Sequence, residues 1–185
     1  MPCLLSNDDV VLNFQGRSLP DEELNYYEWH LNDKLVSVIA AFSPFGFLCW
    51  RIFYDTPINA ASVRQFLEDD LARYINKHTI VLLDNASIYK TFDTLDVLDN
   101  VCNSRYAFIP AFSYRYSPIE RGFGLVWNYV QGYEDQARLQ REPLVVLHEA
   151  FWVYSIYGPY GDKALNEFNL YKNNRHQYEN EMDAF

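Results

Sequence analysis

The sequence predicts one α/β domain in which a mixed sheet of five strands is flanked by helices. Short β-rich runs gather in the first third of the chain, and brief apolar runs then alternate with stripes of apolar residues at helical spacing. The length of 185 residues, with 49% hydrophobic and 22% charged residues, is enough for one core but too short for two comfortable ones. A single folded domain is therefore expected.

The first elements are expected to be strands. Residues 36–42 and 47–54 are β-rich, and the four residues Ser43 to Gly46 that join them place proline second and glycine fourth, as in a β-turn. We therefore predict a hairpin. A weaker apolar run from Leu4 to Leu12 would supply a strand before it.

A helix and a buried strand are predicted next. Asn59 can cap a helix that ends near Lys77, because apolar residues recur there every three or four positions. The run at 79–83 is too apolar for a half-exposed strand, so it is expected at the centre of the sheet, ending at Asp84. A weaker helix around 95–102 and a strand at 106–109 follow.

The last elements are expected to be helices. Ser117 and Pro118 suit the cap and first position of one helix, and two more are predicted at about 143–157 and 162–173. Up to the helix that begins at Pro118, the order is three strands, helix, strand, helix, strand, helix, which is the ribonuclease-H-like topology. We expect residues 1–175 to form this domain and residues 176–185 to form a polar tail.

Composition limits the classes of function. The net charge of −10 argues against tight, unaided DNA binding, because proteins that grip phosphates carry a basic face. It is compatible with a carboxylate metal site, where bound cations restore positive charge. Three widely spaced cysteines suggest neither a disulfide framework nor a zinc site. With no membrane-length apolar run and no signal-peptide pattern, we expect a protein that is not secreted, nuclear in a eukaryote and otherwise cytoplasmic.

Two acidic residues stand in motifs at a strand end and a helix start. Residues 81–89 read Val-Leu-Leu-Asp-Asn-Ala-Ser-Ile-Tyr, and residues 110–120 read Pro-Ala-Phe-Ser-Tyr-Arg-Tyr-Ser-Pro-Ile-Glu. Thirty-five residues separate Asp84 from Glu120, and Trp127 follows. These motifs resemble those of DDE transposases of the mariner-like superfamily, which typically show Asp-Asn-Ala-x-x-His and, later, Asn-Pro-Ile-Glu.

The resemblance implies a metal-dependent DNA endonuclease and strand-transferase core. Family members carry a first acid, in Asp-Glu-Ser-x-x-Asn, at the end of the first strand, and Asp8 matches it here, with Asp9 where Glu is usual. Asp8, Asp84 and Glu120 would then be the catalytic residues and the ligands of two Mg²⁺ or Mn²⁺ ions. Hard divalent ions prefer such oxygen ligands, and two of them suit in-line displacement at phosphorus.

Simpler interpretations of each acid remain open. Asp84 could begin a turn, Glu120 could complete a capping box with Ser117, and Asp8 could belong to a solvated terminus. The sequence also departs from the family pattern, with Tyr89 in place of histidine, Ser117 in place of asparagine and Arg115 in the loop between. None of these departures removes a predicted metal ligand.

The expected partner is DNA, bound weakly. The family's helix-turn-helix region, which recognises transposon ends, is absent from this sequence, although Tyr114 and Tyr116 could touch DNA near the site. A homodimer is a further expectation, and a membrane partner is not expected. Two other functions stay open: a domesticated, inactive domain that serves as a protein-interaction module, and a structure-specific or RNA-directed nuclease.

Overall fold

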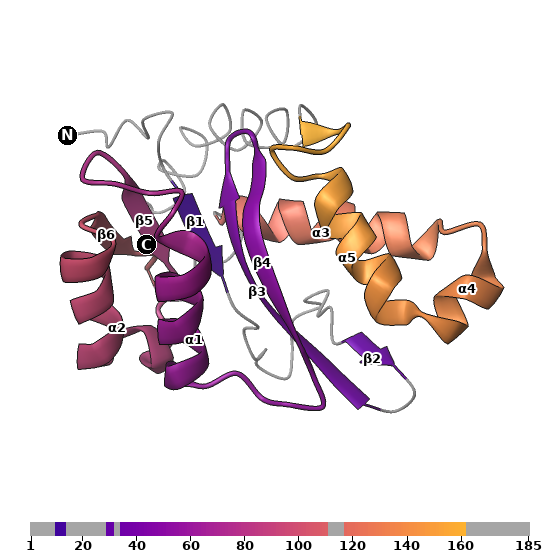
Figure 1. Ribbon diagram of the computed structural model, residues 1–185, viewed down its shortest axis with the longest axis horizontal. Coiled ribbons are helices and arrows are strands. Elements are labelled where there is room, and N and C mark those ends of the chain that lie inside the picture. Colours follow the sequence, from indigo (N-terminus) through magenta and orange to yellow (C-terminus); the bar gives the residue numbers. More distant parts are fainter. Residues whose placement is uncertain (1–9, 14–28, 32–33, 111–116, 162–185) are drawn as a thin grey trace, which may run out of the picture.

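A computed structural model describes residues 10–13, 29–31, 34–110 and 117–161. Its strands form one mixed sheet in the order β2-β3-β1-β5-β6, with β4 paired to β3 (Figure 1). The strands are β1 (Val10–Asn13), β2 (Trp29–Leu31), β3 (Lys34–Ser43), β4 (Gly46–Tyr54), β5 (Ile80–Leu83) and β6 (Arg105–Phe108). The predicted count of five is wrong, because the described residues contain six. The strand not predicted is β2, which at three residues is too short to show a period.

Three neighbouring strands run in the same direction. β1 is antiparallel to β3 but parallel to β5, and β5 is parallel to β6. The carboxyl ends of β1, β5 and β6 therefore meet at one edge of the sheet, where functional groups of open α/β sheets collect. Asp84 directly follows β5 at this edge.

The predicted hairpin is confirmed. Ser43 pairs with Gly46, and the Ser43 hydroxyl donates to the Gly46 carbonyl oxygen over 3.0 Å. Gly46 has a φ of 123°, in the region that favours glycine, and an added Cβ would lie 2.5 Å from the Tyr154 carbonyl oxygen. Glycine is therefore required here both by the turn and by the neighbouring backbone.

One face of the sheet is covered by the two helical segments on the left of Figure 1. They are α1 (Ala60–Phe66), which continues as the π-helix η1 (Leu67–Leu71), and α2 (Phe92–Asp96), which continues as the π-helix η3 (Val97–Val101). The Asn59 side chain accepts a hydrogen bond from the Ser62 amide at 3.0 Å, as its predicted role as a cap requires. The predicted end near Lys77 is wrong, because regular helix stops at Leu71 and turns follow.

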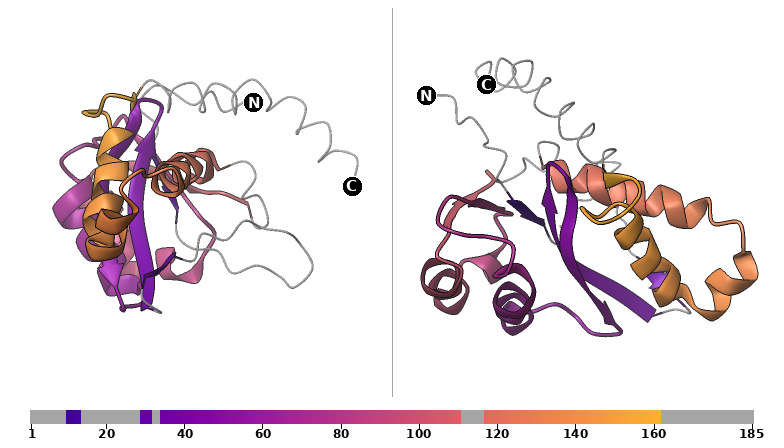
Figure 2. Two further views of the ribbon diagram at one scale, coloured as in Figure 1. Left: turned by 90° about the vertical axis from the view of Figure 1, so that its right-hand side faces the viewer. Right: turned by 45° about the horizontal axis from the view of Figure 1, so that its top comes forward.

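The opposite face is covered by α3 (Pro118–Gln131) and α5 (Pro143–Val153), which lie across the β3–β4 hairpin from α1 and α2 in the right-hand view of Figure 2. In the sequence they are joined through α4 (Gln136–Arg141), a short helix without buried residues that the sequence pattern did not predict. The helix predicted at 143–157 ends earlier, at Val153, and the one predicted at 162–173 lies outside the described residues. None of the helices in the described ranges is long and apolar enough to cross a bilayer.

The alternation of side chains along the sheet divides the core in two. The α1 side buries a cluster that includes Val81 and Leu83 of β5, and the α3 side buries one that includes Ala40 of β3 and Ile119 of α3. We call these the α1-side cluster and the α3-side cluster. Leu82, between the two buried β5 residues, packs against the α3-side cluster. The strand is thus covered on both faces, as its apolar sequence predicted.

Candidate functional site

Asp84 is the acid at the carboxyl edge of the sheet. It is partly buried, and its Oδ1 atom accepts a hydrogen bond of 2.7 Å from the amide of Asn85. This bond reaches the next residue, whereas the side-chain bond of an Asx turn is made two residues further on. It engages one carboxylate oxygen, so it does not prevent the carboxylate from binding a cation as well.

Tyr89, at the position where the family pattern has histidine, stands close to Asp84. It is fully buried in the α1-side cluster, and its pKa is raised well above the usual value of 10, first by burial and then by the negative charge of Asp84. The ring is therefore a neutral packing residue beside the acid. It anchors the short 3₁₀ turn η2 (Ser87–Tyr89) that follows Asp84.

Lys90 brings a positive charge to this edge, and sequence reasoning missed it. Its ammonium group donates a hydrogen bond to the side-chain oxygen of Asn85 and lies 5.4 Å from the ring centroid of Phe108, at the end of β6. No motif marks Lys90 in the sequence. The η2 turn, which folds the chain back after Asp84, is what places the lysine beside the strand ends.

Glu120 is the acid at the start of α3. The Ser117 hydroxyl makes no capping bond, is buried and has no hydrogen-bond partner among the described residues; the Glu120 amide donates instead to the Ser117 backbone oxygen over 3.2 Å. The serine half of the proposed capping box is therefore not formed. The start of α3 therefore does not depend on the Ser117 hydroxyl.

A glycine brings the start of α3 close to the sheet. A Cβ on Gly122 would lie 2.9 Å from a ring carbon of Phe42 and 3.0 Å from one of Phe47. The helix packs against β1 and β3 at this close approach. Glu120, two residues before the glycine, is thereby held on the α3 side of the sheet.

Gly122→Val should therefore weaken both the fold and the site. Overpacking of this kind typically costs about 1–3 kcal/mol, since the aromatic rings or the helix must move. We expect a loss of that size in urea unfolding. Asn128→Val, an exposed change on the same helix, should cost only a few tenths of a kcal/mol. Equal losses in the two variants would show that the packing beneath Glu120 is not tight.

The third predicted acid, Asp8, lies outside the described residues, as do Arg115, Tyr114 and Tyr116. Among the residues that the structure does describe, no group of three histidine, cysteine or acidic side chains could hold a metal ion. Asp84 and Glu120 are thus the two predicted ligands whose positions the fold defines, one at a strand end and one at a helix start.

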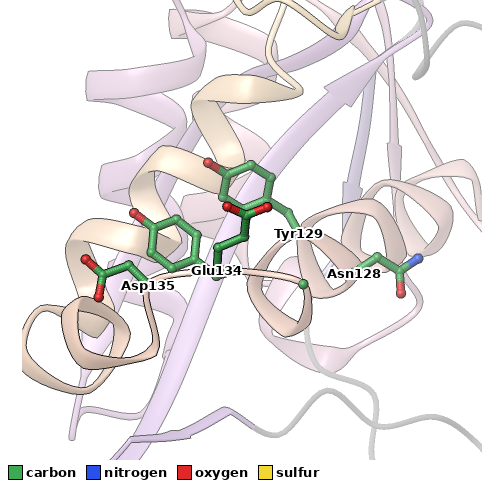
Figure 3. A pocket seen from close by; sticks show the side chains of 6 residues that line it. Asn128, Tyr129, Glu134 and Asp135 are labelled. Atoms are coloured by element: carbon green, nitrogen blue, oxygen red, sulfur yellow. The ribbon is translucent and has the colours of Figure 1, made fainter.

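A pocket of about 450 Å³ lies at the other end of α3 (Figure 3). It is lined by Asn128, Tyr129, Gly132, Tyr133, Glu134 and Asp135. Burial, together with a 3.1 Å hydrogen bond to Glu149, raises the pKa of Tyr129 to about 12. The pocket begins eight residues along the helix from Glu120, roughly 12 Å away, and its acidic rim does not suit a phosphate. It is separate from the candidate site.

The comparison with protein families decides the class of the chain. Residues 10–140, more than half of the sequence, match the family described as DDE superfamily endonuclease. The chain belongs to this family. The resemblance of the two acidic motifs to DDE transposases is thus confirmed. Among curated protein sequences, none is significantly similar to this endonuclease-family chain.

Solved structures show which fold this DDE-family domain has. The catalytic domain of the Mos1 mariner transposase matches with a TM-score of 0.59 and 15% identity, over 89% of this chain and 78% of that one. Its complex with Raltegravir and Mg matches with the same score and 13% identity, over 89% and 80%. A simian T-cell lymphotropic virus intasome matches with a TM-score of 0.54 and 13% identity, over 81% of this chain. The ribonuclease-H-like fold is confirmed.

The chain spans about half of the length of some of these proteins. It covers 49% of the matched intasome chain and 54% of the chain in a pre-cleavage Mos1 transpososome. The likeness therefore extends over only part of those longer chains.

Proposed function

We propose that this domain is a transposase-type, metal-dependent DNA endonuclease and strand-transferase core. One observation carries the proposal: in a DDE-family domain, Asp84 ends a buried parallel strand while Glu120 opens the helix packed against the same sheet. Strand ends of this kind collect catalytic groups in open α/β sheets. The two acids would act together on a phosphodiester bond.

The two carboxylates suit a Mg²⁺ or Mn²⁺ ion, because both ions prefer oxygen ligands and Mg²⁺ is usually bound by one or two carboxylates with water. Asp84 and Glu120 would hold the ion. When bound, it would lower the pKa of an attacking water or hydroxyl and stabilise the departing oxygen. Asp8 stays the third ligand that the sequence predicts. Mos1 has been solved with Mg and with Mn, which agrees with this choice of metal.

Lys90 would help to bind the substrate. Its contacts with Asn85 and the Phe108 ring hold an ammonium group beside the strand ends. A point charge at this place can pair with a phosphate of the DNA backbone. The net charge of −10 nevertheless predicts weak, salt-sensitive binding to DNA by the domain alone.

A second candidate function is a domesticated domain that binds another protein. The strongly acidic net charge of −10 favours this alternative. The two functions differ in whether phosphodiester bonds are cut.

Nicking of supercoiled plasmid tests the proposal. We expect slow conversion to open circles with Mn²⁺ at low salt and high protein concentration, and none with excess EDTA. Raising the salt should suppress the reaction steeply, since binding depends on phosphate contacts. A folded protein that cuts no DNA with either metal would leave the protein-interaction module as the better function.

A further inference from the structure

The end of β1 nearest to Asp84 carries an amide rather than an acid. In the parallel pair of β1 and β5, Val10 aligns with Val81, Val11 with Leu82 and Leu12 with Leu83. One residue further along, Asn13 ends β1 and Asp84 directly follows β5, so continuing the same register sets these two residues level. Residues level with each other in neighbouring parallel strands are close and belong to the same face.

The pairing of β1 with β3, its antiparallel neighbour, shows on which face of the sheet position 13 lies. Asn13 pairs with Ala40, which is buried in the α3-side cluster, and Leu12 pairs with Ala41, which is buried in the α1-side cluster. Directly paired residues share a face. Position 13 is thus on the side of the sheet against which α3 packs, and Glu120 is in the first turn of that helix.

We infer that Asn13 takes the third place in the Asp84–Glu120 site, so that this chain holds its divalent ion with two carboxylates and one amide. The inference rests on the proposed metal-dependent function. An amide oxygen can bind Mg²⁺ or Mn²⁺, but it contributes no negative charge, and the charge of the ligands sets much of the affinity. The site should therefore bind its ion weakly. Asp8, two residues before β1, is the competing candidate for this place.

The Mn²⁺ affinity of the wild type and three variants tests the inference by binding alone, without an activity assay. Titration calorimetry on the wild type, Asn13→Asp, Asp8→Asn and Gln140→Glu should show tighter binding, by about tenfold or more, in Asn13→Asp alone. Gln140→Glu is the control, because it adds one negative charge at an exposed position of α4, beyond the far end of α3. Adding Asp84→Asn to Asn13→Asp should remove the gain, since the two carboxylates would bind the same ion.

A variant that adds no charge gives a second measurement. Asn13→Ala should weaken Mn²⁺ binding several-fold by removing the amide oxygen, whereas Asp8→Asn should leave it unchanged. Thermal unfolding with and without Mn²⁺ should follow the same order, because an ion that binds the native state raises its stability.

The outcomes separate this inference from the proposed function. If Asp8→Asn weakens Mn²⁺ binding while both Asn13 variants behave like the wild type, the inference is overturned and the metal-dependent function stands. If Asn13→Asp binds Mn²⁺ tightly but the wild type nicks no DNA, the inference is supported and the proposed function of the present sequence fails. If no variant binds Mn²⁺, both fail.

Discussion

Asp84→Asn is expected to lower the rate of plasmid nicking at least about 100-fold. The substitution keeps the shape of the side chain and removes the charge that would hold the ion, and metal ions typically supply several kcal/mol of transition-state stabilisation. The fold should survive, because Asp84 is only partly buried and the side-chain oxygen of asparagine can still accept the bond from the Asn85 amide. Initial rates of nicking at saturating Mn²⁺ measure the effect.

Glu120→Gln should cause a comparable loss for the same reason. Glutamine can also occupy the glutamate position of a capping box, so a loss of activity would report on chemistry rather than on helix stability. Asp99→Asn is the control: it removes the same charge from an exposed acid on η3, which covers the opposite face of the sheet. Nicking that persists in both site variants would come from a contaminant or another site.

Phe47→Ala is expected to lower the free energy of unfolding by about 3–5 kcal/mol, the usual range for a large buried aromatic side chain. Phe47 is completely buried in the α3-side cluster, where its ring centroid lies 4.9 Å from those of Phe42 and Phe151. It joins the β3–β4 hairpin to α5, and its backbone also pairs with the segment after that helix. The cavity would therefore open where the sheet and the helices meet.

Urea unfolding followed by circular dichroism measures this loss. Phe45→Ala, two residues earlier in the hairpin turn, is the matched control, because that ring is 49% exposed. Phe45→Ala should lower the free energy of unfolding by far less than Phe47→Ala, on the order of 1 kcal/mol or less. Similar losses in the two variants would mean that the aromatic cluster is not the main source of stability at this interface.

The sequence by itself determined the features that depend on neighbouring residues. The turn from Ser43 to Gly46 has the proline and glycine that its backbone needs, and the run at 79–83 is apolar enough to be buried on both faces. Pro118 begins α3 as predicted. These local signals, with the two acidic motifs, sufficed to predict the ribonuclease-H-like fold and the family.

Tertiary structure decided the features that depend on residues far apart in the chain. The alignment of Asn13 with Asp84, the approach of Lys90 to the strand ends and the absence of a capping bond at Ser117 have no local pattern. The first strand illustrates the reason. Its four residues carry too weak a period to reveal where the strand ends, and only hydrogen bonding to β3 and β5 determines which residue stands level with the acid.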